Sequence, residues 1–158
     1  DVKSLDRLMG IYYYSVGRGA NLLLNIGPDR RGLLPDKDRQ RLLEFGNEIR
    51  RRFSNPLASI SDFKKDGLKW SCDCAKPVTF DHAVIKEDLR EGENVRRFRI
   101  VAVPYPNGQE ITIYEGMSIG HKAICSFPTI KAGRVVLEIV EADEEPRISG
   151  IDLYYSGK

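Results

Sequence analysis

Asn21-Leu22-Leu23-Leu24-Asn25-Ile26-Gly27-Pro28 is the stretch of this sequence that decides the fold. Its apolar run lacks the polar alternation of a half-exposed strand, so a strand over residues 21–26 would need cover on both faces. Such burial is typical of a parallel strand inside an α/β sheet or barrel. Because no other segment reads as a parallel strand, we expect residues 21–26 to be one strand of a barrel whose other strands lie outside this sequence.

Helical periodicity flanks this stretch on both sides. The apolar residues before it share one helix face: Leu5, Leu8, Met9, Tyr12 and Val16. With Ser4 as a cap, they predict a helix over residues 4–16. The apolar stripe after it consists of Leu42, Phe45, Ile49 and Phe53. With Pro35 in the first turn, it predicts a helix over residues 35–53, and helix, strand and helix together make an α/β unit.

The periodicity changes to two after a polar connector, residues 54–67. Alternating apolar residues follow in at least four segments, around 78–84, 98–102, 111–113 and 135–139. Turn dipeptides punctuate them at 91–92, 107–108, 115–116 and 132–133, and Asn107-Gly108 is a strong hairpin signal. We therefore predict an antiparallel β-sandwich or jelly roll over residues 68–158, after an α/β unit over 1–53 and a linker over 54–67.

Composition narrows the class of protein. The chain is 41% hydrophobic and 30% charged, as in ordinary globular domains, and its formal net charge is +2. That charge is too small to argue for a nucleic-acid partner, and no apolar run reaches the ~20 residues of a membrane helix, so we expect neither a nucleic-acid nor a membrane partner. The opening residues, 1–4, do not resemble a signal peptide.

The three cysteines leave several states open. Cys72 and Cys74 are two residues apart, so in a strand they share a face, and either can lie near the remote Cys125. Idle thiols are the preferred interpretation, ahead of one disulfide. A metal site is the weakest alternative, because no ligand-spacing motif is present. We expect neither a metal nor a cofactor.

The stretch 19–28, with Gly32 and Pro35, resembles the last strand and helix of the catalytic barrel in α-L-fucosidases of glycoside hydrolase family 29. The family usually has glycine where Ala20 stands. The second half is similar to the family's C-terminal sandwich, a discoidin-like, galactose-binding-type domain, through residues 77–80, 85–96, 116–122, 127–128, 134–137 and 146–153.

This resemblance implies the C-terminal end of a (β/α)8 barrel followed by a sandwich that braces it. It implies a parent enzyme that hydrolyses terminal α-L-fucose on glycans with retention, using an Asp and a Glu about 5–5.5 Å apart. Both residues belong to earlier barrel strands in the family, so we expect no catalytic residue here and no activity of this chain alone. By analogy with the family alone, we expect the parent enzyme to be exported to the periplasm or out of the cell.

One other interpretation stays open: the chain can be a stand-alone carbohydrate-binding module of the galactose-binding type, with its N-terminal helices as a remnant or an adaptor. Without its barrel, the chain can also self-associate through exposed apolar residues of the barrel remnant. Candidate sugar-binding side chains are Asn25, Trp70 and His121. Each has a structural alternative, which we prefer: a turn role for Asn25 and its neighbour Asp29, a core position for Trp70 and a turn cap for His121.

Two further expectations concern charged or polar residues. We expect His82 to share a strand face with Phe80 and Val84 as a core histidine. We also expect the run Arg50-Arg51-Arg52 to lie on a solvated helix face.

Overall fold

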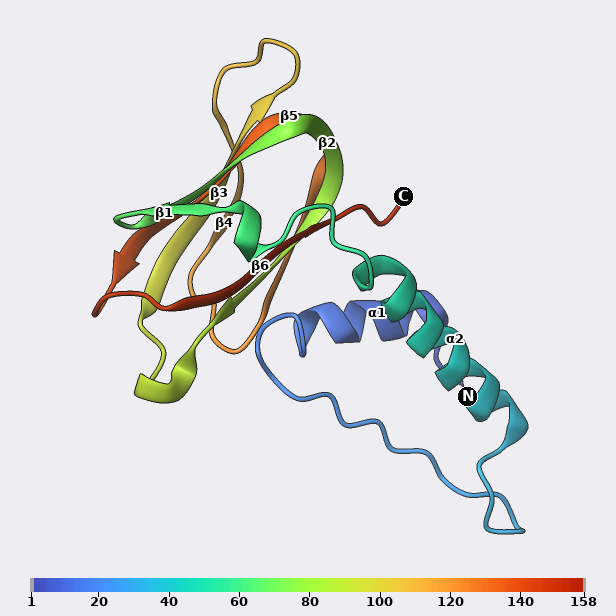
Figure 1. The fold of residues 1–158 in the computed structure, drawn as a ribbon. Coiled ribbons are helices and arrows are strands. Elements are labelled where there is room, and N and C mark those ends of the chain that lie inside the picture. Colours follow the sequence, from blue (N-terminus) through green and yellow to red (C-terminus); the bar gives the residue numbers. More distant parts are fainter. Residues whose placement is uncertain (1, 158) are drawn as a thin grey trace.

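The computed structural model describes residues 2–157 of the chain. This part contains two α-helices and six β-strands (Figure 1). The helices are α1 (Leu5–Tyr14) and α2 (Asp36–Phe53). The strands are β1 (Lys64–Asp66), β2 (Lys69–Glu87), β3 (Val95–Pro104), β4 (Ile111–Gly116), β5 (Ala123–Ala142) and β6 (Ile148–Tyr154). Two 3₁₀ turns, η1 (Ile60–Asp62) and η2 (Leu89–Glu91), lie between them.

The strands form one antiparallel sheet that bends into two layers. Its order is β1-β2-β5-β3-β4, and β6 pairs with the second half of β2. The long strands β2 and β5 run through both layers: residues 69–73 pair with 134–138 beside β3, and residues 82–85 pair with 123–126 beside β6. The fold is therefore mainly β and sandwich-like, as the alternating pattern predicted.

The main core lies between the two layers. Its largest fully buried side chains include Phe80, Phe98, Ile85, Leu137 and Leu153. Phe80 meets Phe127 edge to face, with ring centroids 5.5 Å apart. Burial of such aromatic and branched side chains supplies the main free energy that holds the layers together.

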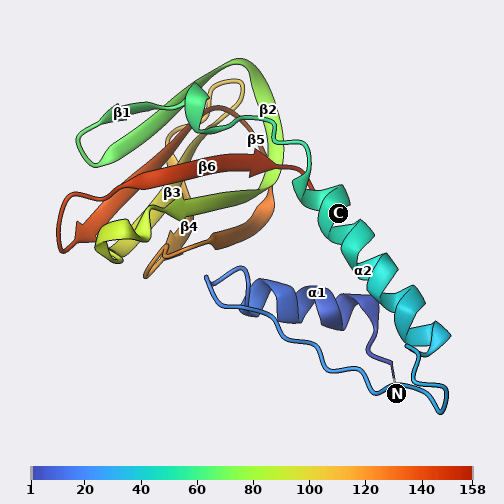
Figure 2. The same cartoon turned by 60° about the horizontal axis from the view of Figure 1, so that its bottom comes forward.

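Both predicted helices are confirmed, with small shifts at their ends. The Ser4 side chain accepts a hydrogen bond from the Arg7 backbone N–H at the start of α1. Pro35 directly precedes α2, whose first turn carries Asp36 and Asp38 and therefore complements the helix dipole. Figures 1 and 2 show both helices to one side of the strands.

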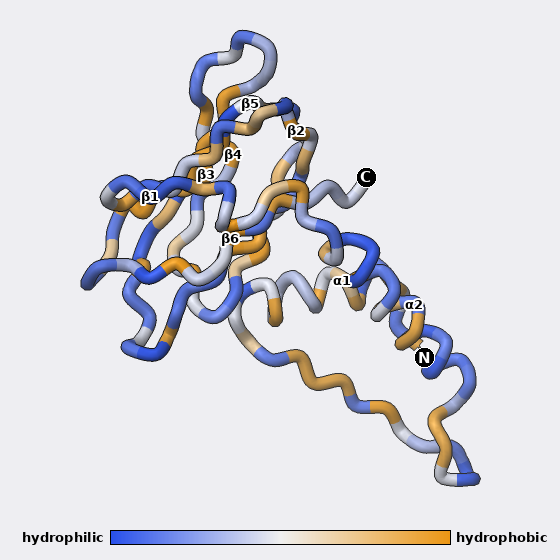
Figure 3. Tube along the Cα trace, in the orientation of Figure 1, coloured by the Kyte–Doolittle hydropathy of each residue, from blue (hydrophilic) through white to orange (hydrophobic). Residues whose placement is uncertain are grey.

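The predicted strand over residues 21–26 does not form. The segment is extended but has no ladder partner among the described residues, because none of them supplies a neighbouring parallel strand. Leu22 and Leu24 pack against the helices, whereas Leu23 is 84% exposed. Figure 3 shows this hydrophobic stretch running away from the sandwich.

Two details of the strands also differ from prediction. Ala132-Gly133 is not a turn, since β5 continues through it and changes register there. A second register shift, between Phe80 and His82, reverses the side-chain alternation of β2. Phe80 therefore lies in the main core, while His82 and Val84 face the helices, so the prediction that all three share a face is wrong. The predicted linker 54–67 contains η1 and β1.

Gly116 is expected to resist substitution because it lies opposite Phe98 across the β3–β4 pair. A Cβ on Gly116 would come within 2.4 Å of the Phe98 ring, which is 1% exposed. We expect Gly116→Ala to cost about 1–3 kcal/mol of unfolding free energy, measured by urea denaturation. Gly133→Ala is the matched control, since its Cβ would meet no atom within 4 Å. Equal stabilities of the two variants would contradict this account of the β3–β4 packing.

Candidate functional site

A second hydrophobic cluster joins the helices to the sheet. It combines residues of α1 and α2 with outward-facing residues of β2, β5 and β6: Leu8, Met9, Tyr12, Phe45, Val84, Ile124 and Tyr154. Phe53 of α2 packs edge to face on Tyr154, with ring centroids 5.4 Å apart. The layer formed by β6 and the adjoining halves of β2 and β5 is thus covered on both faces. The junction is therefore the part of the molecule where both halves of the chain meet.

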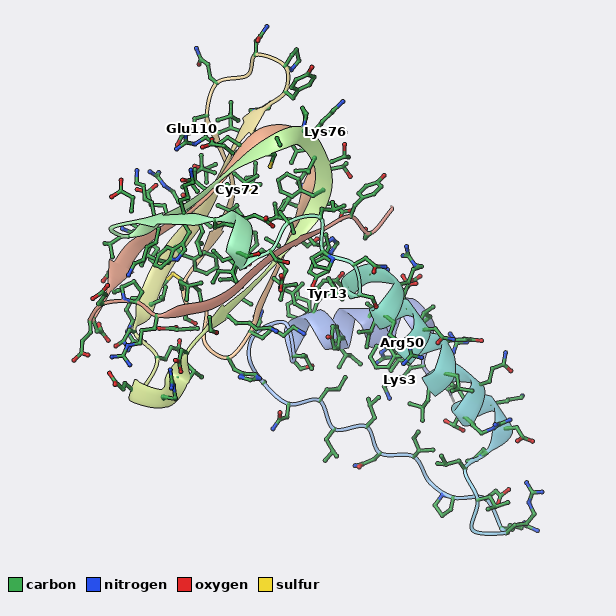
Figure 4. All side chains as sticks on the ribbon, in the orientation of Figure 1. Lys3, Tyr13, Arg50, Cys72, Lys76 and Glu110 are labelled. Carbon is green, nitrogen blue, oxygen red and sulfur yellow. The ribbon has the colours of Figure 1, made fainter. Side chains whose placement is uncertain are left out.

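A chain of hydrogen bonds crosses this junction. The carboxylate of Asp81 accepts from His82 Nδ1 at 2.6 Å, and His82 Nε2 lies 2.7 Å from the Tyr13 hydroxyl. Arg52 Nη1 donates to that hydroxyl at 3.1 Å. The Asp81 carboxylate favours an imidazole proton on Nδ1, and in the tautomer that carries its proton there the Tyr13 hydroxyl donates to Nε2. Figure 4 shows Tyr13 between α1 and the strands.

The series of hydrogen bonds continues along α2 and closes into a ring. Glu48 accepts from Arg52 Nε at 2.7 Å and from Arg51 Nε at 2.7 Å. Arg51 also donates to the backbone carbonyl of Ser156 at 2.5 Å. Ser156 completes the ring, since its N–H and hydroxyl donate to Asp81 at 2.8 and 2.6 Å. We call these seven residues the junction ring: Tyr13, Glu48, Arg51, Arg52, Asp81, His82 and Ser156.

The charges of the ring stabilise one another. The hydrogen bond from Arg51 and the nearby Arg52 lower the pKa of Glu48 from 4.5 to about 2. Burial raises the pKa of Asp81, but hydrogen bonds from Ser156 and His82 outweigh it and lower the net value. Burial raises the pKa of Tyr13, against the opposing effect of Arg52. At neutral pH the ring therefore holds two carboxylates, two guanidiniums and a neutral phenol.

A cavity of about 470 Å³ opens beside the ring. Tyr13, Arg52, Asp81 and His82 line it together with Tyr114, Phe127 and Thr129. Asp81 is the one carboxylate among its lining residues, and both of its oxygens are occupied by donors. Glycoside hydrolysis by two flanking carboxylates needs a second carboxylate, and the lining of this cavity does not supply one. The arrangement is suited to fixing the helices against the sheet.

The structure does not bring the three predicted sugar-binding residues together. Asn25 is exposed and lines a cavity of about 100 Å³ beside Asp38. Trp70 lies in the main core, 5% exposed, with the Lys65 ammonium 5.3 Å from its ring centroid. His121 is exposed just before β5. Their binding roles stay predictions.

The structural alternative for Asp29 is confirmed. Its carboxylate accepts from the backbone N–H groups of Arg31 and Leu33, at 2.8 and 3.1 Å. Hydrogen bonds from Arg31 and Leu33 also lower the pKa of this carboxyl group. Asp29 therefore organises the turn between the extended segment and α2.

Sequence reasoning missed the junction ring. The prediction of a fully solvated Arg50-Arg51-Arg52 run is wrong for Arg52, which is 7% exposed. Its position seven residues after the buried Phe45, on the same helix face, is a signal of burial, and Glu48 one turn earlier is a signal of its partner. Asp81 and Ser156 carry no such signal, because their contacts come from distant parts of the chain.

Residues 2–157 contain neither a candidate metal centre nor a candidate membrane-spanning helix. No cluster of three or more His, Cys, Asp or Glu side chains there could hold a metal ion. No helix in that range is long and apolar enough to cross a membrane.

The comparisons with known proteins point to one family. Residues 1–52 match the family model of α-L-fucosidase. The chain is 26% identical to a provisionally named α-L-fucosidase 1 of Oryza sativa subsp. japonica. The match covers 93% of this chain and 34% of that protein. The chain spans about a third of the length of the curated relatives it matches.

Two solved structures extend the likeness over nearly the whole chain. One is a provisionally assigned α-L-fucosidase of Bacteroides thetaiotaomicron VPI-5482, with 36% identity and a TM-score of 0.88 over 96% of this chain and 34% of that one. The other is a glycoside hydrolase 29 family member from an unknown rumen bacterium, with 32% identity and a TM-score of 0.91 over 99% of this chain and 29% of that one. The family-model match and the structural likeness thus agree that the chain is similar to α-L-fucosidases, which are glycoside hydrolases.

Proposed function

We propose that this chain is the C-terminal part of a retaining α-L-fucosidase. In this proposal residues 1–53 end the catalytic (β/α)8 barrel, residues 54–67 link it to the sandwich, and residues 68–158 form a galactose-binding-like jelly roll that braces it. The parent enzyme acts on fucosylated glycans. The two catalytic carboxylates belong to barrel strands outside this chain, so the chain alone is inactive.

The unpaired segment 21–26 is the observation that carries the proposal. Its even-numbered side chains, Leu22 and Leu24, pack against the helical layer, and Leu23 points away from it. That alternation is what a barrel strand has, with one face toward the helices and the other toward the barrel interior. The segment lies within residues 1–52, which match the family model.

The junction ring supports the bracing role. It ties both helices of the proposed barrel end to β2 and to the segment after β6. In the isolated chain, side chains that the rest of the catalytic domain would cover are exposed to solvent. Among them are Leu23 and Leu43, which are 84% and 55% exposed. We expect these to promote self-association of the chain alone.

The stand-alone binding module is not favoured, because the matches extend through residues 1–52 as well as the sandwich. For the same reason residues 1–53 are better explained as part of a catalytic domain than as an adaptor.

Turnover by the chain alone is the decisive measurement. We expect no release of 4-nitrophenol from 4-nitrophenyl α-L-fucoside above the buffer rate, because neither member of a carboxylate pair is available. A full-length α-L-fucosidase serves as the positive control, and circular dichroism establishes that the chain is folded. Turnover by the folded chain that follows its concentration would overturn the proposal.

A further inference from the structure

Two thiols lie next to each other on β2. Cys72 Sγ and Cys74 Sγ are 3.7 Å apart, on the same face of the strand. Cys72 is buried, and Cys74 is partly exposed. Both line a cavity of about 480 Å³ at the surface, together with Leu57, Asp62 and Lys76. Figure 4 shows Cys72 and Lys76 on the same long strand.

We propose that Cys72 and Cys74 are a dithiol, reached from solvent through Cys74, that a small disulfide such as glutathione disulfide oxidises to an intrachain disulfide. Cys125 takes no part in this reaction, since it is buried to 0% exposure in the main core. The inference is independent of the glycosidase assignment, because it rests on β2 and its cavity alone.

The backbone allows the two sulfurs to close. Residues two apart in a regular strand have Cα atoms about 6.6–6.8 Å apart, which is at the upper limit for a disulfide. A small bend at Asp73, whose backbone angles set the distance between the Cα atoms of residues 72 and 74, would shorten it. Asp73 is the last residue that pairs with β5 before the register shift. The ladder with β5 loses its register between Asp73 and Val78, so residues 74–77 have no paired partner on β5 to hold them straight.

The different surroundings of the thiols set the order of events. Burial, together with the hydrogen bond to Cys74, raises the pKa of Cys72 to about 12. Cys72 is therefore the poorer attacking group, since a thiolate is the attacking species, and the partly exposed Cys74 attacks first. Its sulfur attacks one sulfur of glutathione disulfide, forms a mixed disulfide and releases one glutathione thiolate.

The second step is intramolecular. Cys72 loses its proton to solvent and attacks the Cys74 sulfur of the mixed disulfide, which lies within van der Waals range, and the second glutathione leaves as its thiolate. The protein dithiol has lost two electrons and two protons, and glutathione disulfide has become two glutathione molecules. The resulting ring spans only residues 72–74, so it constrains the unfolded chain very little and is not a structural staple.

Peptide mapping of the 158-residue chain tests the proposal directly. The chain is incubated with glutathione disulfide, its free thiols are alkylated in denaturant, and trypsin releases peptide 70–86 with both thiols and peptide 123–131 with Cys125. We expect peptide 70–86 to lose the mass of two hydrogens, unalkylated, and to regain it with dithiothreitol. We expect Cys125 to be alkylated throughout.

Three variants sharpen the result. Cys72→Ser should stop at one glutathione on Cys74, Cys74→Ser should abolish the reaction of the pair, and Cys125→Ala should leave it unchanged. The wild-type peptide map decides the matter even if a variant fails to fold. Two alkylated thiols in peptide 70–86, or a persistent glutathione adduct in the wild type, would overturn the proposal. So would a linkage that joins peptide 70–86 to peptide 123–131.

Discussion

Asp81→Ala is expected to lower the unfolding free energy by about 3–5 kcal/mol. The Asp81 carboxylate is buried and accepts three hydrogen bonds, one from His82 Nδ1 and two from Ser156. Alanine would leave all three donors without an acceptor, away from water. Urea denaturation at pH 7, followed through the fluorescence of Trp70, measures the loss.

Two variants separate the hydrogen bonds of Asp81 from its charge. Asp81→Asn keeps an amide oxygen for the two donors that Oδ1 now serves, so we expect a smaller loss of about 1–2 kcal/mol. Asp73→Ala is the matched control on the same strand, because its side chain is 69% exposed and pairs only loosely with Arg134, at 3.3 Å. A loss for Asp81→Ala no larger than that for Asp73→Ala would show that the junction ring does not hold the fold together.

Acid is expected to weaken the junction through Glu48. Its pKa is about 2 in the folded chain, compared with an ordinary value of 4.5. A lowered folded-state pKa means that the unfolded state takes up the proton first. The stabilisation is therefore complete above about pH 5 and is lost as the pH falls toward 2. Since the side chain is 15% exposed, we expect this contribution to be about 2–3 kcal/mol.

The pH profile of Glu48→Gln tests that contribution. At pH 7 the variant should be less stable than the wild type by most of this amount, and the two unfolding free energies should converge near pH 2. Glu44→Gln on the same helix is the control, since Glu44 contacts Arg41 and Gln40 on the surface. A constant difference between wild type and Glu48→Gln from pH 7 to pH 2 would rule out the titration of Glu48 as its source.

Local periodicity predicted the elements that depend on local spacing. The stripes ending at Val16 and Phe53 gave both helices, and Asn107-Gly108 marked the connection of β3 and β4, which pair as a hairpin. Gly133 misled for a physical reason, because a glycine inside a strand can serve a bend as well as a turn. The segment 21–26 has the composition of a strand, yet pairing needs neighbours that the described residues do not supply.

The junction could not be predicted in the same way. The register shift between Phe80 and His82 turns the histidine toward α1, and nothing in the alternation of residues 78–84 indicates where such a shift falls. Tyr13 and His82 are separated by 69 residues, and Asp81 and Ser156 by 75. These contacts depend on how α1 docks on the sheet and on where the segment after β6 runs, which are properties of the whole tertiary structure.

The passage of β2 and β5 through both layers bears on how the sandwich melts. Neither layer has a complete set of its own strands, so one cannot open while the other persists without breaking these two ladders midway. We expect the strands to behave as one cooperative unit, with amide hydrogens of the β6 side and the β3 side exchanging at similar rates through global opening. The extended residues 20–28, which belong to no ladder, should exchange first.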